Sequence, residues 1–191
     1  MTTANVRNNR RTEDAARGFL GSAALADHLQ RVLVDLIELH LQGKQAHWNV
    51  VGPNFRDLHL QLDEIVDMAR EASDTIAERM RALHATADGR SDTVAATTTL
   101  PAFPAGEQST ADVARAVTAR LNAAAATLRA VHDDVDAEDP SSADLLRAIV
   151  EDLEKQAWML SAEGSAPHET RPSPAAPGPG SGRARPRPGL S

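Results

Sequence analysis

The strongest constraint on the fold is the helical spacing of apolar residues in four long stretches of the chain. In the first stretch, Leu25, Leu29, Leu33, Leu36 and Leu39 recur at intervals of three and four residues, which is the period of one face of an α-helix. Aromatic residues make up only 3% of the 191 residues, and this composition favours helices over sheet. A chain of this length holds one core and is short for two, so we predict an all-α protein with a single domain.

Capping residues and helix breakers mark the ends of the first two helices. The first is expected to begin after Ser22 and to end at Gly52-Pro53, because serine caps helices and proline stops them. The second is expected to begin after Asn54 and to run without Gly or Pro to Asp88-Gly89. Its apolar stripe consists of Leu58, Leu62, Ile65, Ala69, Ala72 and Ile76.

A long connection follows Gly89, and we expect it to hold one short helix that begins at Ser91 or Asp92 and stops before Pro101. The third helix is expected to follow Ser109 or Thr110 and to run to about residue 136. The fourth is expected to begin at residues 141–142, after Pro140, and to end near residues 163–164. Two helix pairs joined by one long crossover describe a ferritin-like four-helix bundle.

The two ends of the chain differ from the acidic body between them. We expect residues 1–17 to be a mobile basic arm, residues 18–163 to be the ferritin-like domain, and residues 164–191 to be a disordered tail rich in Pro, Gly and Arg. Residues 1–12 and residues 164–191 each carry a net charge of +3. Because the whole chain carries −7, residues 13–163 carry a net charge of −13. This pattern bears on partners, since only the ends can attract phosphate.

The absence of cysteine excludes disulfides and thiolate metal sites, so a bound metal must use His, Asp and Glu. The chain shows neither a signal segment nor an apolar run long enough to cross a membrane. We therefore expect a cytoplasmic protein without a membrane partner.

Four possible ligands share one face of the predicted second helix. His59, Asp63, Asp74 and Glu78 fall within about 100° of its circumference, away from the apolar stripe. Any single acid of this kind is usually a solvated surface residue. However, His59 and Asp63 are spaced i and i+4, so both can point at one ion, and His47 precedes them near the turn between the two helices.

The distance between the two pairs of ligands indicates a site built from two chains. The His59 and Asp63 pair is centred about 15 residues, or roughly 22 Å, from the Asp74 and Glu78 pair, so one ion cannot reach both. A second copy packed antiparallel around a two-fold axis would bring the first pair of one chain opposite the second pair of the other. Such a site suits Fe(II), Mn(II) or Zn(II); we expect iron, with zinc or manganese as competitors.

These residues resemble the signature of Dps proteins, the starvation-induced mini-ferritins of bacteria. The stretch HWNVVGPNFRDLHLQLD (47–63) meets every position of the pattern H-W-N-x-x-G-x-x-F-x-x-x-H-x-x-x-D, and DTIAER (74–79) meets D-x-x-A-E-R. The similarity covers roughly residues 20–163 and is closest to actinobacterial members with long tails; neither tail matches the family pattern.

The resemblance implies a hollow dodecamer with ferroxidase sites at its two-fold interfaces. Its members oxidise Fe(II), preferably with hydrogen peroxide rather than oxygen, store ferric oxide, protect DNA from oxidative damage, and in many cases bind DNA without sequence preference. Carried over residue by residue, the resemblance assigns both catalysis and metal binding to His47, His59, Asp63, Asp74 and Glu78.

Several residues outside the ligand set are further candidates for a functional role. Trp48 could intercept stray oxidising equivalents beside His47, although packing near the interface is the favoured interpretation. In the family an acidic three-fold pore lies near the junction of the third and fourth helices; here Asp136 and Asp144 are the first choices among the acids Asp133, Asp134, Asp136, Glu138, Asp139 and Asp144. Surface or satisfied roles are expected for the histidines His28, His40, His84, His132 and His168.

Other function classes remain in competition with an iron-oxidising storage protein. The main alternative is a nucleoid-associated protein that compacts DNA through its basic ends, with the cage as a scaffold. A di-iron oxygenase or a larger ferritin would need Glu-x-x-His pairs on two helices of the same chain, and the sequence contains none.

Overall fold

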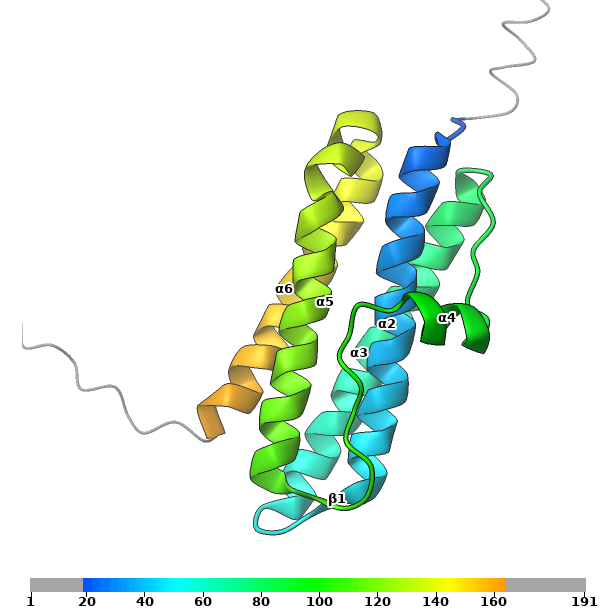
Figure 1. Ribbon diagram of the computed structural model, residues 1–191. Helices are drawn as coiled ribbons and strands as arrows, with labels where there is room; N and C mark the ends of the chain where they lie inside the picture. The colour runs from blue at the N-terminus through cyan, green and yellow to red at the C-terminus, as the bar shows by residue number, and fades with distance from the viewer. Residues whose placement is uncertain (1–18, 164–191) are drawn as a thin grey trace, which may run out of the picture.

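Four long helices form the described part of the protein, residues 19–163 of the computed structural model (Figure 1). α2 (Ala23–Asn49) packs along α3 (Phe55–Ala82), and α5 (Thr110–Glu138) packs along α6 (Pro140–Glu163). The predicted all-α four-helix bundle is confirmed. The expected arm at 1–17 and tail at 164–191 lie outside the described residues. None of the described helices has both the length and the apolar character that a bilayer span requires.

The apolar stripes predicted from the sequence form the core of the bundle. All five leucines of the α2 stripe are at most 2% exposed, and the six residues of the α3 stripe are buried as well. They join buried residues of α5 and α6 in a single apolar cluster. Because a fully buried leucine contributes roughly 1.5–3 kcal/mol, this shared core is what holds the two helix pairs together.

Helix beginnings follow the predicted caps in two cases and depart from them in two. Ser22 Oγ accepts from the backbone N–H of Leu25 at 3.1 Å, and Ser109 caps α5 through the N–H of Asp112. Asn54 precedes α3 as expected, but it adopts a left-handed conformation with φ 59° and its side chain makes no capping bond. The fourth helix begins at Pro140 rather than at residues 141–142, because proline fits the first helical position, where no N–H partner is needed.

Helix ends depart from the expected positions. α3 stops at Ala82, short of the expected Asp88-Gly89. His84 takes up a left-handed conformation with φ 64°, and the N–H of Ala85 donates to the carbonyl of Met80 at 2.9 Å. This pattern closes a helix and usually has glycine at the left-handed position, so a histidine there is not recognised as a helix end from the sequence. α5 runs two residues beyond the expected end, to Glu138.

The crossover contains the expected short helix and ends in an unexpected short strand, which pairs with a second strand in the α2–α3 turn. α4 (Ser91–Thr97) lies beside α2 and ends before Pro101, as predicted. At the end of the crossover, β2 (Gln108–Ser109) pairs in parallel with β1 (Val50–Val51), which follows α2. The pairing ties the α2–α3 turn to the start of α5. Gly52 in this turn has φ 123°, a conformation that side chains rarely adopt.

Two buried polar residues fasten the crossover to the bundle. Asp35 of α2 is fully buried and accepts four hydrogen bonds, from Thr98, Thr127 and both the N–H and the hydroxyl of Thr99. Arg120 of α5 donates to the carbonyls of Ala116 and Ala102, each at 2.6 Å. Burial lowers the pKa of Arg120 from its usual value. These contacts hold the crossover against α2 through Thr98 and Thr99 and against α5 through Ala102.

Candidate metal centre

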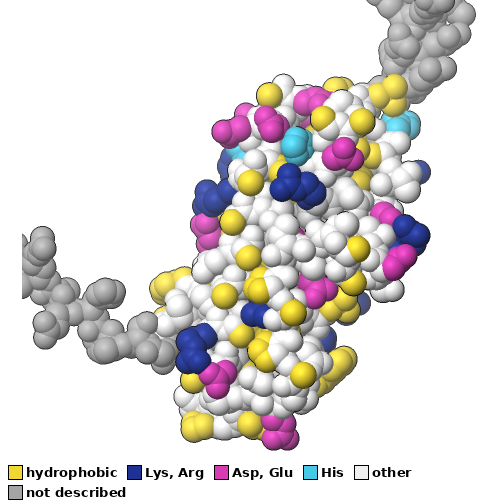
Figure 2. Space-filling view, in the orientation of Figure 1, with side chains coloured by type: hydrophobic (Ala, Val, Ile, Leu, Met, Phe, Trp, Pro, Cys, Tyr) yellow, Lys and Arg dark blue, Asp and Glu magenta, His cyan; other side chains and the backbone are white. Residues whose placement is uncertain are grey.

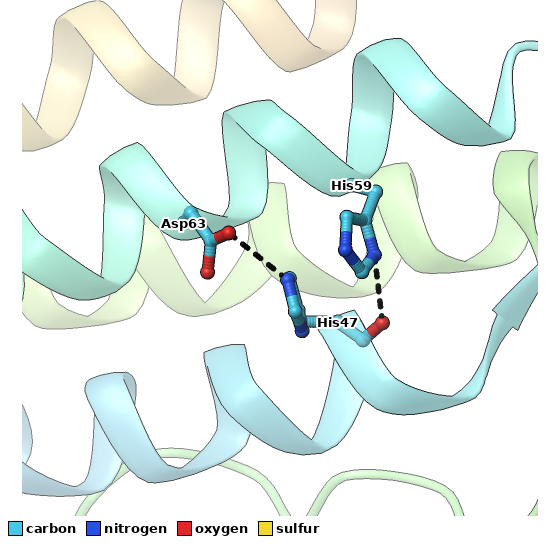
Figure 3. Close-up of side chains that lie close together, drawn as sticks. All are labelled: His47, His59 and Asp63. Atoms are coloured by element: carbon cyan, nitrogen blue, oxygen red, sulfur yellow. Dashed lines mark hydrogen bonds and ion pairs between the residues drawn. The ribbon is translucent and has the colours of Figure 1, made fainter.

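Three of the five predicted ligands meet where α2 lies against the start of α3 (Figure 3). His47 comes from the last turn of α2, and His59 and Asp63 come from the first turns of α3. One possible ligand atom from each residue lies within 4.8 Å of the other two. The tight turn at residues 50–54 produces this meeting, because it reverses the chain between His47 and His59. The i, i+4 spacing then places Asp63 on the same side of α3.

The hydrogen bond made by His59 leaves its other ring nitrogen free for a cation. His59 Nδ1 lies 3.2 Å from the backbone carbonyl oxygen of His47, and a carbonyl can only accept, so Nδ1 carries the proton. The lone pair of the neutral ring is then on Nε2. The two imidazole rings stack with centroids 3.6 Å apart, and the Phe55 ring lies 5.0 Å from His59. Ring orientation is therefore set before any metal arrives.

The electrostatics of the cluster favour the protonation states that bind metals. Burial lowers the pKa of His47 below its usual value, although the nearby Asp63 opposes this change. The hydrogen bond from Lys44 is the main cause of a lowered pKa for Asp63, which partial desolvation opposes. His47 is thus held neutral and Asp63 ionised near neutral pH, and these are the forms that coordinate a divalent ion.

Each oxygen of Asp63 already has a partner. His47 Nε2 donates to Oδ2 at 3.0 Å, and the ammonium of Lys44 donates to Oδ1. His47 Nδ1 is buried and makes no hydrogen bond within residues 19–163. Lys44 was not singled out from the sequence. Its position one helical turn before His47 was the available signal, since residues three apart share a helix face.

The structure does not bring Asp74 and Glu78 to this cluster. Both residues are exposed on α3, further from the α2–α3 turn. Neither joins the one group of His, Asp and Glu side chains within the described chain that could hold an ion. Asp74 instead borders an open hollow that His40 and Arg70 also line. A single chain therefore presents three ligands together, and the role of the other two stays a prediction.

Several large apolar side chains are exposed on the same elements that carry the cluster. Trp48, next to His47, is 71% exposed, so it does not pack in the core of its own chain. Four other apolar residues of α2, α3 and the turn between them are also exposed: Leu41, Val51, Phe55 and Leu60. Exposed apolar groups at this density are typical of a surface that another molecule covers.

The acidic run at the α5–α6 junction divides into structural and exposed residues. Figure 2 shows acidic side chains gathered at this end of the molecule. Asp139 is buried and accepts from Arg79 at 2.6 Å, while Glu138 accepts from the N–H and hydroxyl of Ser22, each at 2.7 Å. The first choices for a pore, Asp136 and Asp144, are exposed and both lie beside Arg147. Their pore role stays a prediction.

The expectation of surface or satisfied histidines holds only in part, because one ring nitrogen each of His28, His40 and His132 is buried and has no hydrogen-bond partner within residues 19–163. His28 lies 3.7 Å from a carboxylate oxygen of Asp134, and His132 lies 3.1 Å from Asp133. His84 occupies the left-handed position after α3. His168 lies outside the described residues.

Comparisons with known proteins place this geometry in context. A family model described as a ferritin-like domain matches residues 26–163. A DNA protection during starvation protein from Agrobacterium fabrum is 39% identical over 135 residues, which are 70% of this chain and 83% of that protein. The ferritin-like character of the predicted bundle is confirmed.

Solved structures agree with the sequence comparisons. Dps from Microbacterium arborescens in the high iron form is 36% identical, with a TM-score of 0.72, over 76% of this chain and 98% of that one. A Dps protein from Streptomyces coelicolor is 31% identical, with a TM-score of 0.74, over 78% and 90% of the two chains. Relatives in Microbacterium and Streptomyces support part of the expected closeness to actinobacterial members. The fold, the ligand cluster and these matches together establish that the chain belongs to the Dps proteins, a branch of the ferritin-like family.

Proposed function

We propose that the protein is a ferroxidase and iron-storage mini-ferritin whose catalytic sites are shared between two chains. The observation that carries this proposal is the half-site formed by His47, His59 and Asp63, which holds three ligands and lacks the further carboxylates that a di-iron reaction needs. Asp74 and Glu78 of the partner subunit would complete it. This chain's match to a ferritin-like domain and the high iron form of the similar Microbacterium protein support iron as the substrate.

The ligand set favours oxidation of iron. Carboxylate oxygens stabilise Fe(III) over Fe(II), because the higher charge prefers anionic oxygen ligands. Two Fe(II) ions each give one electron to one hydrogen peroxide molecule, which takes up two protons and leaves as two water molecules. Both electrons are accepted together, so no hydroxyl radical is released. Hydrolysis of the Fe(III) product then gives the ferric oxide that the cage would store.

Assembly into a hollow dodecamer is part of the same proposal. Exposed apolar residues on α2 and α3 include Trp48 and Leu60, which adjoin His47 and His59 in the sequence, and they would provide a surface for a second copy. An isologous two-fold contact is the commonest symmetry in proteins, and it creates two equivalent shared sites at once.

The decisive test is complementation between two inactive variants. One is the double variant His59→Ala/Asp63→Ala, and the other is Asp74→Asn/Glu78→Gln. Each alone should lose rapid peroxide-dependent formation of ferric product after anaerobic addition of Fe(II). Dissociated and reassembled together at equal amounts, they should recover about a quarter of the wild-type rate, because half of the pairs are mixed and each mixed pair has one intact site.

Two outcomes would contradict the proposal. If the variant Asp74→Asn/Glu78→Gln keeps the wild-type rate of ferric product formation, Asp74 and Glu78 are not needed. Failure to recover activity in reassembled mixtures that have the same particle size as wild type would show that the sites are not shared. Soluble ferric product that migrates with the assembled protein would support storage.

DNA protection is a second candidate function, and the charge distribution favours it. The acidic body repels phosphate, while each end of the chain carries +3, and many copies on one cage would multiply weak contacts. The Agrobacterium relative is named for DNA protection. Binding should weaken steeply as salt rises and be lost on deletion of residues 164–191. Full binding by the truncated protein would instead point to the N-terminal arm.

We propose that the protein resides in the cytoplasm, in part with the nucleoid, because both activities would act there.

A further inference from the structure

We infer that Lys44 is a built-in competitor of the metal, whose ammonium group neutralises Asp63 until a divalent cation displaces it. This inference rests on the proposed function, because it takes Asp63 as a ligand. Lys44 and His47 together occupy both oxygens of the Asp63 carboxylate. A cation that binds Asp63 therefore competes with these two donors for the negative charge of the carboxylate. Only Lys44 is a donor that cannot itself become a ligand while it remains charged.

The position of Lys44 suits a group that moves aside. It lies one turn before His47 on α2, and the side chains of Lys44 and Asp63 are 34% and 40% exposed. Its long, flexible stem can carry the ammonium group into water without leaving an unsatisfied buried charge.

A fixed positioning role would be the opposite interpretation of the same contact. In that case Lys44 would hold Asp63 in place for the metal, and its removal would weaken binding. Two features argue against it. Asp63 is already oriented by the 3.0 Å hydrogen bond from His47. In addition, a charged ammonium in contact with a carboxylate that also holds a divalent ion would face strong repulsion between like charges.

The expected effect of Lys44 is moderate. A solvent-reachable ion pair is a weak interaction, so the metal must break only a weak bond to enter. Replacing Lys44 by methionine, which keeps the stem and removes the charge, should tighten divalent metal binding by roughly two- to tenfold. Replacement by arginine keeps the charge and should give no gain in affinity.

The test uses Co(II) alone, which does not undergo the iron reaction and whose visible absorption reports ligand binding. Dissociation constants are measured for assembled full-length protein with the wild-type sequence, Lys44→Met, Lys44→Arg and, as a matched control, Lys155→Met. Lys155 is the other lysine in the sequence and is exposed on α6. The expected result is tighter binding in Lys44→Met and wild-type affinity in Lys155→Met.

Each other outcome separates this inference from the proposed site. Unchanged or weaker binding in Lys44→Met, with binding still lost in His59→Ala/Asp63→Ala, would overturn the role of Lys44 and leave the site in place. An equal gain in Lys44→Arg would also overturn it, because the charge would then be irrelevant. Co(II) binding that is the same in wild type and in His59→Ala/Asp63→Ala would remove the site itself, and the role of Lys44 with it.

Discussion

Replacement of Asp35 by alanine should loosen the crossover between the two helix pairs. Asp35 is fully buried on α2, and its carboxylate is the common acceptor for side chains from two distant segments. The N–H of Thr99 donates to it at 2.7 Å, and Thr127 of α5 donates at 2.7 Å. Thr98 adds a third donor at 3.0 Å. Alanine would remove the acceptor and leave these groups facing an apolar side chain.

The loss in free energy of unfolding depends on which of these donors can be solvated after the substitution. Thr98 is partly exposed and Thr99 is exposed, so their hydroxyl groups can be solvated after the change. The Thr99 N–H and the buried Thr127 hydroxyl cannot be solvated without local opening. The Thr99 N–H loses its partner, at a cost of about 1–3 kcal/mol, whereas the Thr127 hydroxyl keeps the Thr99 hydroxyl 3.1 Å away and should cost only about 1 kcal/mol. Asp35→Ala should therefore cost about 2–4 kcal/mol in total. Asp35→Asn keeps one acceptor oxygen, and its amide can donate to hydroxyls that turn, so it should cost only about 1 kcal/mol.

Two measurements check this prediction. Urea unfolding at one fixed protein concentration gives the loss in free energy of unfolding. Hydrogen exchange of the Thr99 amide gives the local effect, which should be on the order of 30- to 1,000-fold faster exchange in Asp35→Ala. Equal losses for alanine and asparagine, or unchanged exchange at Thr99, would refute the argument that this carboxylate anchors the crossover.

Three further predictions concern helix contacts. Desolvation tends to raise the pKa of Asp139, but hydrogen bonds from Ser142 and Arg79 outweigh it and lower that pKa. The variant Asp139→Asn should therefore lower the free energy of unfolding by about 2–3 kcal/mol at pH 7. Since the native pKa is depressed, this difference should persist above about pH 4 and shrink as acid titrates the native carboxylate, which urea unfolding across pH measures; a pH-independent difference would contradict it. Gly43→Ala should cost about 1–3 kcal/mol, because its Cβ would lie 2.8 Å from Cγ2 of the stiff Val66 side chain, and thermal unfolding as stable as wild type would count against this. His84→Gly should raise the free energy of unfolding by up to about 1 kcal/mol by relieving the positive φ at the end of α3; a lower stability would show that the His84 side chain contributes more than its backbone strain costs.

Local patterns in the sequence were sufficient for the helices and for half of the site. The leucines of α2 and the stripe of α3 predict their buried faces, because helical periodicity acts within a few residues. Ser22 and Ser109 mark helix starts for the same reason, since a cap bonds to an amide only three residues away. The meeting of His59 and Asp63 follows from one helical turn, and the nearby turn at Gly52 returns His47 to them.

Contacts between distant segments were decided only by the tertiary structure. The end of α3 at His84 depends on a left-handed residue that is not glycine, which leaves no mark in the sequence pattern. Asp35 is a charged residue in an apolar stripe, and its four donors come from residues more than sixty positions away. Lys44 meets Asp63 across two helices, so the state of the site before metal binding depends on how α2 and α3 dock. The proposed role of Asp74 and Glu78 would depend on a second chain for the same physical reason: side chains far apart in sequence become neighbours only when whole helices pack.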